Sequence, residues 1–301
     1  MPPDPSRTAL RHQRRRRRRL VVLAGAVLVV LIAVAVVELL PKSKPSSSQH
    51  ANTQSTQGAD GSSTTRATAP STTTTDPDAG LPSLGTPTAS APLRVLEVGD
   101  SLGEDLGFRL QADLPATGVA TVAMDSQGDT GLSNENFYDW PSHLEEDLAS
   151  ANPQIVVIFL GANDGQGFDV NGVPEDYGTP EWISAYTERV DEMLQESNRA
   201  GARVVWVGMP LMQDPALNSE MLQLDAIFKA QSARFPGTLY LSSVPVLCPG
   251  DQFTFSITTS SGESEVIRTP DGVHLTTPGA ELVAQAVISG IDARWHLTLK
   301  D

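Results

Sequence analysis

The sequence predicts an α/β fold for residues 91–301, a doubly wound sandwich in which helices cover both faces of a parallel sheet. Short runs of Val, Ile and Leu alternate five times with amphipathic stretches, which is the pattern of repeated strand–helix units. The apolar runs are continuous and do not alternate with polar residues, which favours strands that are buried on both faces. A segment of 211 residues can bury about 70% of its unfolded surface, enough for one stable core.

Five strands and five helices follow from these runs. The strand candidates are Leu93–Val98, Val119–Met124, Ile155–Leu160, Val204–Gly208 and Thr238–Leu241. The helix candidates are Leu102–Asp113, Ser142–Ser150, Pro180–Ala200, Ser219–Arg234 and Pro278–Trp295. In a parallel sheet of this kind, ligands bind beyond the carboxyl ends of the strands, so the residues that follow each strand are the ones to inspect.

One segment departs from the alternation of strands and helices. Residues Gln252–Ile257 alternate apolar and polar side chains, Ser261-Gly262-Glu263 supplies a turn, and Glu265–Arg268 follows. This pattern is typical of a β-hairpin. The hairpin directly precedes Asp271, so it is either a rim of a site at that position or an ornament on the edge of the sheet.

The first 40 residues have a different composition from the domain. Six consecutive arginines, Arg14–Arg19, precede Leu20–Val37, a run of 18 residues without a polar side chain. As a helix this run spans about 27 Å, close to the hydrocarbon thickness of a bilayer. We expect a basic cytoplasmic segment over residues 1–19 and a transmembrane helix over residues 20–40 that acts as a signal anchor.

A cleaved signal peptide is the alternative to this anchor, because Ala33-Val34-Ala35 has the small-x-small form of a cleavage site. That tripeptide lies inside the apolar run with no polar segment before it, and the run is longer than the apolar part of an ordinary signal peptide. The sequence therefore favours a retained anchor. Both interpretations place the C-terminal domain outside the cytoplasm.

Residues 41–90 are predicted to be a disordered linker. The segment 42–90 contains 10 Ser, 11 Thr and 5 Pro in 49 positions. Such a stretch has too little apolar surface to offset the chain entropy that folding removes. Its composition also fits an O-glycosylated stalk.

Charge and cysteine content exclude several classes of function. The chain has a formal net charge of −15, and residues 91–301 alone carry −21, so we expect no nucleic acid partner because this domain would repel a phosphate backbone. The single cysteine, Cys248, excludes an intramolecular disulfide and a cysteine-rich zinc site, and we expect it to be a small buried residue.

We expect neither a metal nor another cofactor. Carboxylates near the predicted strand ends could ligate a divalent metal in a phosphoesterase, namely Asp100, Asp125, Asp129, Asp164 and Asp169. Such sites usually add histidines, and of the three histidines in this domain only His274 lies near. Asp100 and Asp164 are expected to hold the loops at the strand ends by hydrogen bonds to backbone N–H groups.

Four polar clusters lie where a site is expected. They are Gly99-Asp100-Ser101-Leu102, Ser126-Gln127-Gly128-Asp129-Thr130-Gly131-Leu132, Gly161-Ala162-Asn163-Asp164-Gly165 and Asp271-Gly272-Val273-His274. The first three follow the first three predicted strands, and the fourth directly precedes the last predicted helix. The four clusters together form one candidate site.

The residue types in these clusters suit nucleophilic catalysis. Ser101 lies at the start of a helix, and a serine hydroxyl becomes a good nucleophile only when a neighbouring base takes its proton. An imidazole, with a reference pKa near 6.5, suits this role at neutral pH, and His274 is the only histidine in a position to act. Asp271, three residues earlier, can hold the other ring nitrogen and fix the tautomer.

A tetrahedral intermediate would also need hydrogen-bond donors for its oxyanion. The backbone N–H groups of Ser101 and Gly128 and the side-chain amide of Asn163 are well placed by the topology. A glycine suits this position because the backbone must approach the substrate oxygen closely. Gly131 lies in the same cluster and is the alternative to Gly128.

The four clusters, in this order, resemble the conserved blocks of the SGNH/GDSL hydrolases. The clusters around Gly128 and Asn163 are most similar to the bacterial lysophospholipase–thioesterase branch. The resemblance covers residues 93–295 and implies a flavodoxin-like three-layer sandwich with a five-stranded parallel sheet. It also implies metal-free ester hydrolysis with Ser101 as nucleophile, His274 as base, and Gly128 and Asn163 in the oxyanion hole.

The anchor, the linker and the tripeptide Asp139-Trp140-Pro141 resemble a membrane-anchored subgroup of this family found in actinobacteria. Trp140 either packs beneath the site at the entry of a helix or forms a wall against the substrate. The sequence leaves both possibilities open.

From these features we expect an extracytoplasmic, membrane-anchored serine esterase. It would hydrolyse an acyl or acetyl ester of a cell-envelope carbohydrate or lipid through an acyl-enzyme. The alternatives are an O-acyltransferase that uses the same site and a catalytically silent binding module with the SGNH fold. The partners expected are the small-molecule, glycan or lipid ester and the membrane that holds the N-terminal helix.

Overall fold

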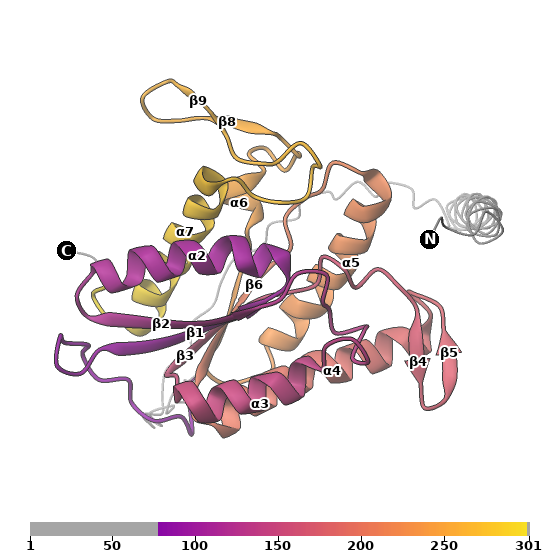
Figure 1. The fold of residues 1–301 in the computed structure, drawn as a ribbon, viewed down its shortest axis with the longest axis horizontal. Coiled ribbons are helices and arrows are strands. Elements are labelled where there is room, and N and C mark those ends of the chain that lie inside the picture. The colour runs from indigo at the N-terminus through magenta and orange to yellow at the C-terminus, as the bar shows by residue number, and fades with distance from the viewer. Residues whose placement is uncertain (1–77, 300–301) are drawn as a thin grey trace, which may run out of the picture. The chain divides into compact units, whose positions relative to one another are not determined.

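A five-stranded parallel sheet organises residues 78–299, the part of the chain that the computed structural model describes (Figure 1). The strands lie in the order β2-β1-β3-β6-β7, and every neighbouring pair is parallel. They are β1 (Leu93–Gly99), β2 (Ala120–Ser126), β3 (Ile155–Phe159), β6 (Arg203–Val207) and β7 (Thr238–Leu241). The sheet confirms the predicted α/β fold, and each strand lies within two residues of its predicted bounds.

Helices cover both faces of this sheet (Figure 1). Helices α2 and α7 pack together on one face, and α3, α4 and α5 cover the other. Their bounds are α2 (Ser101–Ala116), α3 (Trp140–Ala151), α4 (Pro180–Arg199), α5 (Pro215–Ser232) and α7 (Thr277–Trp295), with a short helix α6 (Val244–Leu247) after β7. Strands β3 and β6 are buried throughout, as their continuous apolar sequences predict.

The strand order determines where the candidate site lies on the sheet. The chain runs from β1 outward to β2 and then returns to the other side of β1 to form β3. The connections that leave β1 and β3 at their carboxyl ends therefore diverge, and this reversal is where ligands bind in open α/β sheets. The loops that carry Ser101 and Asn163 meet at this point.

Helix α5 begins four residues earlier than the sequence predicted. Asp214 caps it, because Oδ1 of its carboxylate accepts hydrogen bonds from the N–H groups of Ala216 and Leu217, each at 2.9 Å. Pro215 then occupies the first helical position, where its missing N–H costs nothing. The cap and the proline together set the start of the helix before the apolar pattern begins.

Two hairpins extend from the sheet domain (Figure 1). Strands β8 (Ser256–Thr258) and β9 (Ser264–Val266) confirm the hairpin predicted from the alternating pattern. Strands β4 (Phe168–Val170) and β5 (Val173–Glu175) were not predicted, because each is only three residues long. Asn171 and Gly172 join them, both with positive φ, and this Asn-Gly pair is the sequence signal that could have identified the turn.

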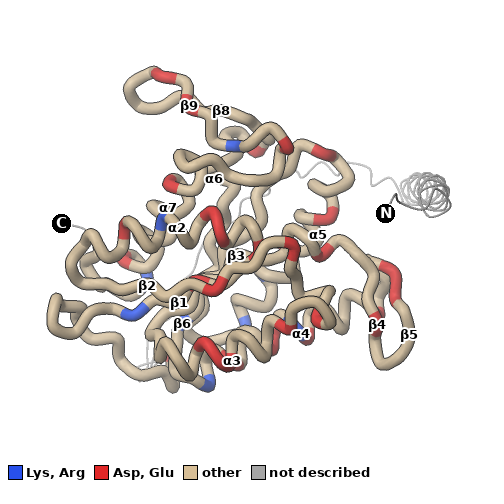
Figure 2. The backbone as a smooth tube through the Cα atoms, viewed as in Figure 1, with Lys and Arg blue, Asp and Glu red and all other residues tan. Residues whose placement is uncertain are grey.

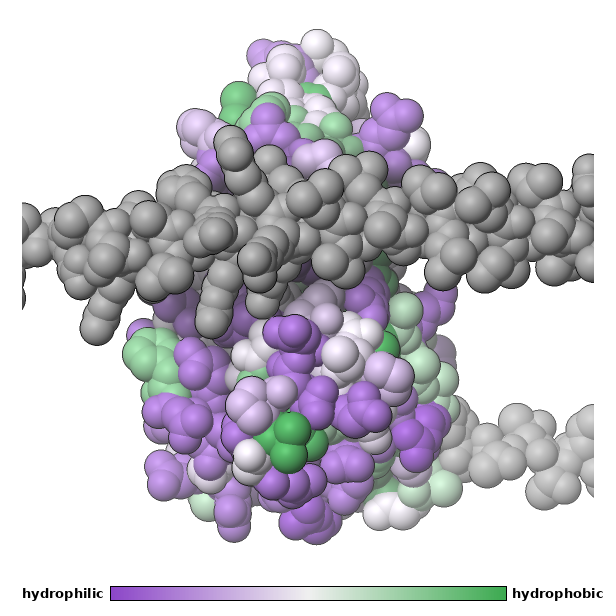
Figure 3. Space-filling view, turned by 90° about the vertical axis from the view of Figure 1, so that its right-hand side faces the viewer, coloured by the Kyte–Doolittle hydropathy of each residue, from purple (hydrophilic) through white to green (hydrophobic). Residues whose placement is uncertain are grey.

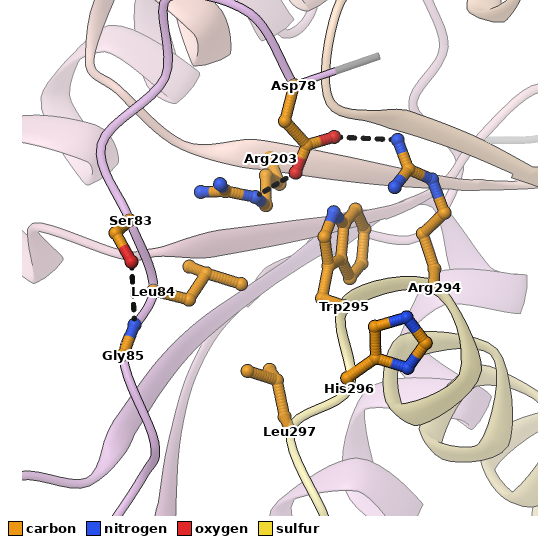
Figure 4. Close-up of a pocket in the computed structure, with 9 residues that line it drawn as sticks. All are labelled: Asp78, Ser83, Leu84, Gly85, Arg203, Arg294, Trp295, His296 and Leu297. Atoms are coloured by element: carbon orange, nitrogen blue, oxygen red, sulfur yellow. Dashed lines mark hydrogen bonds and ion pairs between the residues drawn. The ribbon is translucent and has the colours of Figure 1, made fainter. Parts of the chain in front are cut away.

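The packed part of the chain begins before residue 91. Asp78 forms ion pairs with Arg203 at 2.9 Å and with Arg294 at 2.6 Å (Figure 4). The carbonyl oxygen of Pro82 also accepts a hydrogen bond from Arg203, at 2.8 Å. Arg203 opens β6 and Arg294 lies in the last turn of α7, so these contacts lie at the amino-terminal edge of the sheet. Residues 78–90, assigned to the linker by composition, therefore pack against the domain.

A pocket of about 420 Å³ lies beside this ion pair (Figure 4). It is lined by residues 78 and 83–85 together with Arg203 and residues 294–297. None of the residues of the predicted site belongs to it.

The predicted basic segment, the transmembrane helix and most of the linker lie outside the described residues. Among the helices of residues 78–299, none is long and apolar enough to cross a membrane. The anchor therefore stays a prediction.

The surface of the described part is largely hydrophilic and acidic. Asp and Glu are more frequent than Lys and Arg along the tube in Figure 2, and the visible described residues of Figure 3 are mostly hydrophilic. The large apolar side chains that stay exposed belong to separate elements and are Phe108, Phe137, Val173, Leu222 and Val266. Single exposed apolar residues of this kind are ordinary on protein surfaces and need no special explanation.

One buried carboxyl group lies between the sheet and helix α2. Glu97 on β1 is fully buried, and its Oε2 accepts a hydrogen bond from the Ser126 hydroxyl at 2.6 Å. Its Oε1 has no hydrogen-bond partner among the described residues. Burial raises the pKa of this carboxyl well above the usual value, and the nearby carboxylates of Asp100 and Asp125 raise it further.

We predict that Asp78→Asn lowers the free energy of unfolding by about 2 kcal/mol. The amide would leave the nearly buried Arg203 guanidinium without its counter-charge. Because the NH2 group of an amide cannot accept, one of the two charge-assisted hydrogen bonds would be lost and the other weakened. Urea unfolding measures the change. Glu196→Gln is the control, because it removes one partner of the exposed Arg199 pair and should change stability by less than about 0.5 kcal/mol. Equal effects of the two substitutions would contradict the structural role of Asp78.

We predict that Glu97→Gln becomes more stabilising as the pH rises. In the unfolded chain a glutamate loses its proton near pH 4.3, whereas the folded protein keeps it to a higher pH, so wild-type stability falls as the pH rises through this interval. The glutamine variant lacks this loss. The difference in unfolding free energy between variant and wild type, measured between pH 4 and 8, should increase by at most about 1.4 kcal/mol per pH unit. A difference that does not change with pH would show that Glu97 titrates normally.

Candidate active site

The junction between β1 and α2 carries the candidate nucleophile. Ser101 is the first residue of α2, and Asp100 caps the helix, with Oδ1 accepting from the N–H of Leu102 at 2.9 Å. Oδ2 of the same carboxylate accepts from the N–H groups of Gly161 and Ala162 at 2.9 and 2.8 Å. The junction is therefore held against the end of β3. Burial raises the pKa of Asp100 to about 6, although these hydrogen bonds act in the opposite direction.

A glycine is required just before this junction. A side chain at Gly99 would clash with the carbonyl oxygen of Phe159 at the end of β3. The absence of a side chain lets α2 begin directly beside β3. This close approach brings Ser101 to the loop that carries Asn163.

Ser101, His274 and Asp271 lie in one hydrogen-bonded chain. Nε2 of His274 is 2.9 Å from the Ser101 hydroxyl oxygen, and Nδ1 of His274 is 2.7 Å from Oδ2 of Asp271. A carboxylate on Nδ1 favours the tautomer that carries its proton there, which leaves Nε2 free to accept the serine proton. The structure thus brings together the three residues that the sequence identified, although 170 positions separate Ser101 from Asp271.

Asp271 is held as an anion. Burial raises the pKa of its carboxyl, but hydrogen bonds from the Thr269 hydroxyl and the His274 side chain outweigh this effect. The N–H groups of Val273 and His274 also donate to it, at 2.9 and 3.1 Å. The net result is a pKa well below the usual value for an aspartate, so the group that orients the imidazole stays charged.

Contacts from two other elements hold the loop that carries His274. The N–H of Leu275 donates to Oδ2 of Asp105 on α2 at 2.9 Å, and the N–H of Gln213 donates to the carbonyl oxygen of Gly272 at 3.2 Å. Gly272 has a φ of 73°, and a side chain there would clash with Gln213. Because α2 carries both Ser101 and Asp105, one helix positions both the nucleophile and the loop of the base.

The structure separates the two candidate glycines for the oxyanion hole. A side chain at Gly131 would collide with the carboxylate of Asp164, so this glycine allows a packing contact. A Cβ at Gly128 would meet nothing within 4 Å, so this residue faces open space at the site. Gly131 is therefore taken up by packing, and Gly128, with open space beside its Cα, stays the glycine expected in the oxyanion hole.

Asn163 follows β3 and lies beside the loop that carries Gly128. Its side-chain Nδ2 donates to the carbonyl oxygen of Thr130 at 2.9 Å. The next residue, Asp164, is fully buried and accepts hydrogen bonds from the N–H groups of Leu132 and Ser133 at 3.1 and 2.7 Å. Asp100 and Asp164 thus hold the strand-end loops through backbone N–H groups, as predicted.

Several residues that build the site were not singled out for this role by the sequence. Tyr186 on α4 donates its hydroxyl to Oδ2 of Asp164 at 2.7 Å, and Asp105 on α2 holds the histidine loop.

Trp140 is fully buried, so it packs beneath the site and is not a wall against the substrate. Cys248 is buried, as expected. In residues 78–299 no group of three or more His, Cys, Asp and Glu side chains is arranged to hold a metal ion.

Several solved structures are similar to this chain, each at 18% identity or less. No curated protein matches this chain in sequence. Among solved structures, it is similar to a GDSL-like lipase from Bacteroides thetaiotaomicron, with 16% identity, a TM-score of 0.48, and coverage of 67% of this chain and 88% of the lipase. It is also similar to an acetyl xylan esterase, AlAXEase, with 17% identity, a TM-score of 0.49, and coverage of 66% and 100%. A third is the psychrotrophic esterase EstA from Pseudoalteromonas, with 15% identity, a TM-score of 0.46, and coverage of 67% and 98%.

A family model gives the assignment. The model described as a protein of unknown function (DUF459) matches residues 94–290, which include all four polar clusters and more than half of the chain. The hydrogen-bonded serine, histidine and aspartate have the arrangement of a serine hydrolase. The chain belongs to the DUF459 family, an SGNH-hydrolase-like family, which confirms the resemblance of its four clusters to the SGNH/GDSL hydrolases, while the membrane-anchored subgroup and the branch stay predictions.

Proposed function

We propose that this protein is a membrane-anchored, extracytoplasmic serine esterase that hydrolyses an acyl or acetyl ester of a cell-envelope carbohydrate or lipid. The observation that supports esterase activity is the chain of two hydrogen bonds, at 2.9 and 2.7 Å, from Ser101 through His274 to Asp271. The location rests on the composition of residues 1–90.

In the first half of the reaction, the Ser101 oxygen attacks the carbonyl carbon of the ester and its proton passes to Nε2 of His274. The negative charge that develops on the carbonyl oxygen is met by the N–H groups of Ser101 and Gly128 and by the amide of Asn163. The carbon–oxygen bond to the alcohol then breaks, and the alcohol leaves with the proton from His274. An acyl group stays on Ser101.

In the second half, water attacks the acyl group and passes its proton to His274. The bond to Ser101 breaks, the serine recovers the proton, and the carboxylic acid leaves. Asp271 stays ionised through both halves and stabilises the imidazolium that forms in each.

The exposure of the site favours hydrolysis over acyl transfer. The side chains of His274 and Asp271 are 39% and 48% exposed, so water reaches the base that must activate it. An acyltransferase has to keep water away from the acyl-enzyme until an acceptor arrives. This open arrangement supports an esterase.

The charge of the domain favours an uncharged ester. Residues 91–301 carry a formal charge of −21, and Glu104, Asp105 and Asp271 lie on or beside the elements that carry Ser101 and His274. A field of this sign raises the local concentration of neutral or cationic ligands relative to anionic ones. Acetylated neutral sugars fit this condition better than anionic lipids do.

We predict that a fluorophosphonate probe labels the protein once, at Ser101. Ser101→Ala should remove the labelling and lower kcat by several orders of magnitude, because the nucleophile is lost. Peptide mass spectrometry locates the label, and a panel of p-nitrophenyl esters with two to sixteen acyl carbons measures turnover.

Two controls accompany this experiment. Dialysis against EDTA should leave the rate unchanged, and adding envelope polysaccharide as an acceptor should not divert acyl groups from water. Labelling that survives in Ser101→Ala would contradict the assignment of the nucleophile. Activity that EDTA removes and Zn²⁺ or Mn²⁺ restores would favour the alternative of a metal-dependent phosphoesterase.

We predict that a fusion of alkaline phosphatase to the C-terminus of the full chain is active and stays in the membrane fraction. Arg14–Arg19 should hold the N-terminus in the cytoplasm, and the apolar run Leu20–Val37 should span the membrane once. Membrane fractionation and the phosphatase assay measure the two parts. An active fusion in the medium that begins near Val36 would identify a cleaved signal, and an inactive fusion would contradict the extracytoplasmic location.

A further inference from the structure

Thr130 lies at the centre of a small group of hydrogen bonds beneath the candidate oxyanion hole. Its hydroxyl donates to the carbonyl oxygen of Gln127 at 2.5 Å and accepts from the indole N–H of Trp140 at 3.1 Å. Its own carbonyl oxygen accepts from the side-chain amide of Asn163 at 2.9 Å. Thr130 and Trp140 are both fully buried, so no water competes for these bonds.

The bond to Gln127 controls the direction of the Gly128 N–H. The carbonyl of Gln127 and the N–H of Gly128 belong to the same peptide unit, which is planar and trans, so the two groups point in opposite directions. The Thr130 hydroxyl holds the carbonyl on the buried side of the loop. The N–H of Gly128 is therefore held toward the opposite side of this peptide plane, and a Cβ at Gly128 would meet nothing within 4 Å.

The indole of Trp140 determines which way the hydroxyl hydrogen points. A threonine hydroxyl has one hydrogen to donate and can also accept. Because the Trp140 N–H approaches the oxygen as a donor, the hydroxyl hydrogen is left to bond the Gln127 carbonyl. A buried indole N–H thus fixes the orientation of a peptide unit three residues before Thr130.

The bond from Asn163 aims the second donor. An asparagine amide has two N–H groups. One of them is held by the carbonyl oxygen of Thr130, which fixes the plane of the amide and leaves the other N–H for a ligand. Thr130 therefore bonds the Asn163 amide directly and bonds the carbonyl of the peptide unit that carries the Gly128 N–H.

We propose that Thr130, held by the indole of Trp140, is the positioning residue that aims the Gly128 and Asn163 donors at the oxyanion of the reaction. This inference rests on the proposed esterase function. The tripeptide Asp139-Trp140-Pro141 lies at the start of α3, where Trp140 is the first helical residue and Pro141 follows it. The inference gives this tripeptide a role, because the start of the helix places the indole beside Thr130. Neither residue touches the substrate in this account.

The test compares an ester with its thionoester, in which sulfur replaces the carbonyl oxygen. Sulfur is a weaker hydrogen-bond acceptor, so the thionoester gains less from the oxyanion hole than the ester does. Thr130→Val and Trp140→Phe should each lower kcat/KM for p-nitrophenyl acetate by about tenfold to a hundredfold, since aimed donors of this kind are worth about 100-fold or more when removed outright. The value of kcat/KM for the thionoacetate should fall much less. The ratio of kcat/KM for the ester to kcat/KM for the thionoester should therefore fall.

Matched variants separate positioning from folding. Thr130→Ser keeps the hydroxyl and should restore both the rate and the ratio. Trp206→Phe is the control for Trp140→Phe, because Trp206 is equally buried and its indole N–H has no hydrogen-bond partner among the described residues. Both tryptophan variants should lower the melting temperature, but only Trp140→Phe should change the ratio.

A ratio that stays at the wild-type value in Thr130→Val and Trp140→Phe, with both rates reduced equally, would overturn the inference and leave these residues a purely structural role. Wild-type rates in both variants would overturn it as well. Failure of the proposed function looks different, because the wild-type protein would then hydrolyse no ester in a manner that depends on Ser101.

Discussion

The carboxylate of Asp100 is the interaction on which the site depends. One of its oxygens holds the first turn of α2 through Leu102, and the other holds the end of β3 through Gly161 and Ala162. Without it, three N–H groups would lose their partners in a buried region, at a cost of about 1–3 kcal/mol each. The same carboxylate fixes Ser101 relative to the loop of Asn163, so the nucleophile and one oxyanion donor share one support.

Two further carboxylates repeat this arrangement between other loops. Asp164 joins the loop after β3 to the loop after β2 through Leu132 and Ser133, and Asp105 joins α2 to the loop of His274 through Leu275. The candidate catalytic groups come from four separate loops, and these acids tie each loop to a neighbour. Placing the groups before substrate arrives is what a preorganised site requires. Some of the acidic residues that give this domain its negative charge therefore hold its loops in place.

The sequence alone was sufficient to predict the parallel sheet and the serine, histidine and aspartate of the candidate site. Continuous apolar runs predict buried strands, and the position of each polar cluster after a strand predicts that the clusters converge, because parallel strands end at one edge. The sequence could not predict the contacts of Thr130 with Trp140 or of Asp78 with Arg203 and Arg294. These contacts depend on side-chain directions and on loops whose paths no periodicity reveals. Residues 78–90 have a composition typical of a linker, and partly buried ion pairs of Asp78 with two distant arginines help to hold them against the domain.

The proposed mechanism requires that Ser101 carries the acyl group during turnover. The most direct measurement mixes the protein with p-nitrophenyl acetate, stops the reaction in acid within milliseconds to seconds, and weighs the intact protein by mass spectrometry. We expect a species heavier by one acetyl group, mapped by peptide analysis to Ser101. We also expect His274→Ala to form this species far more slowly. Steady turnover without any acetylated protein, or an acetyl group on another residue that leaves at the rate of turnover, would rule out Ser101 as the nucleophile.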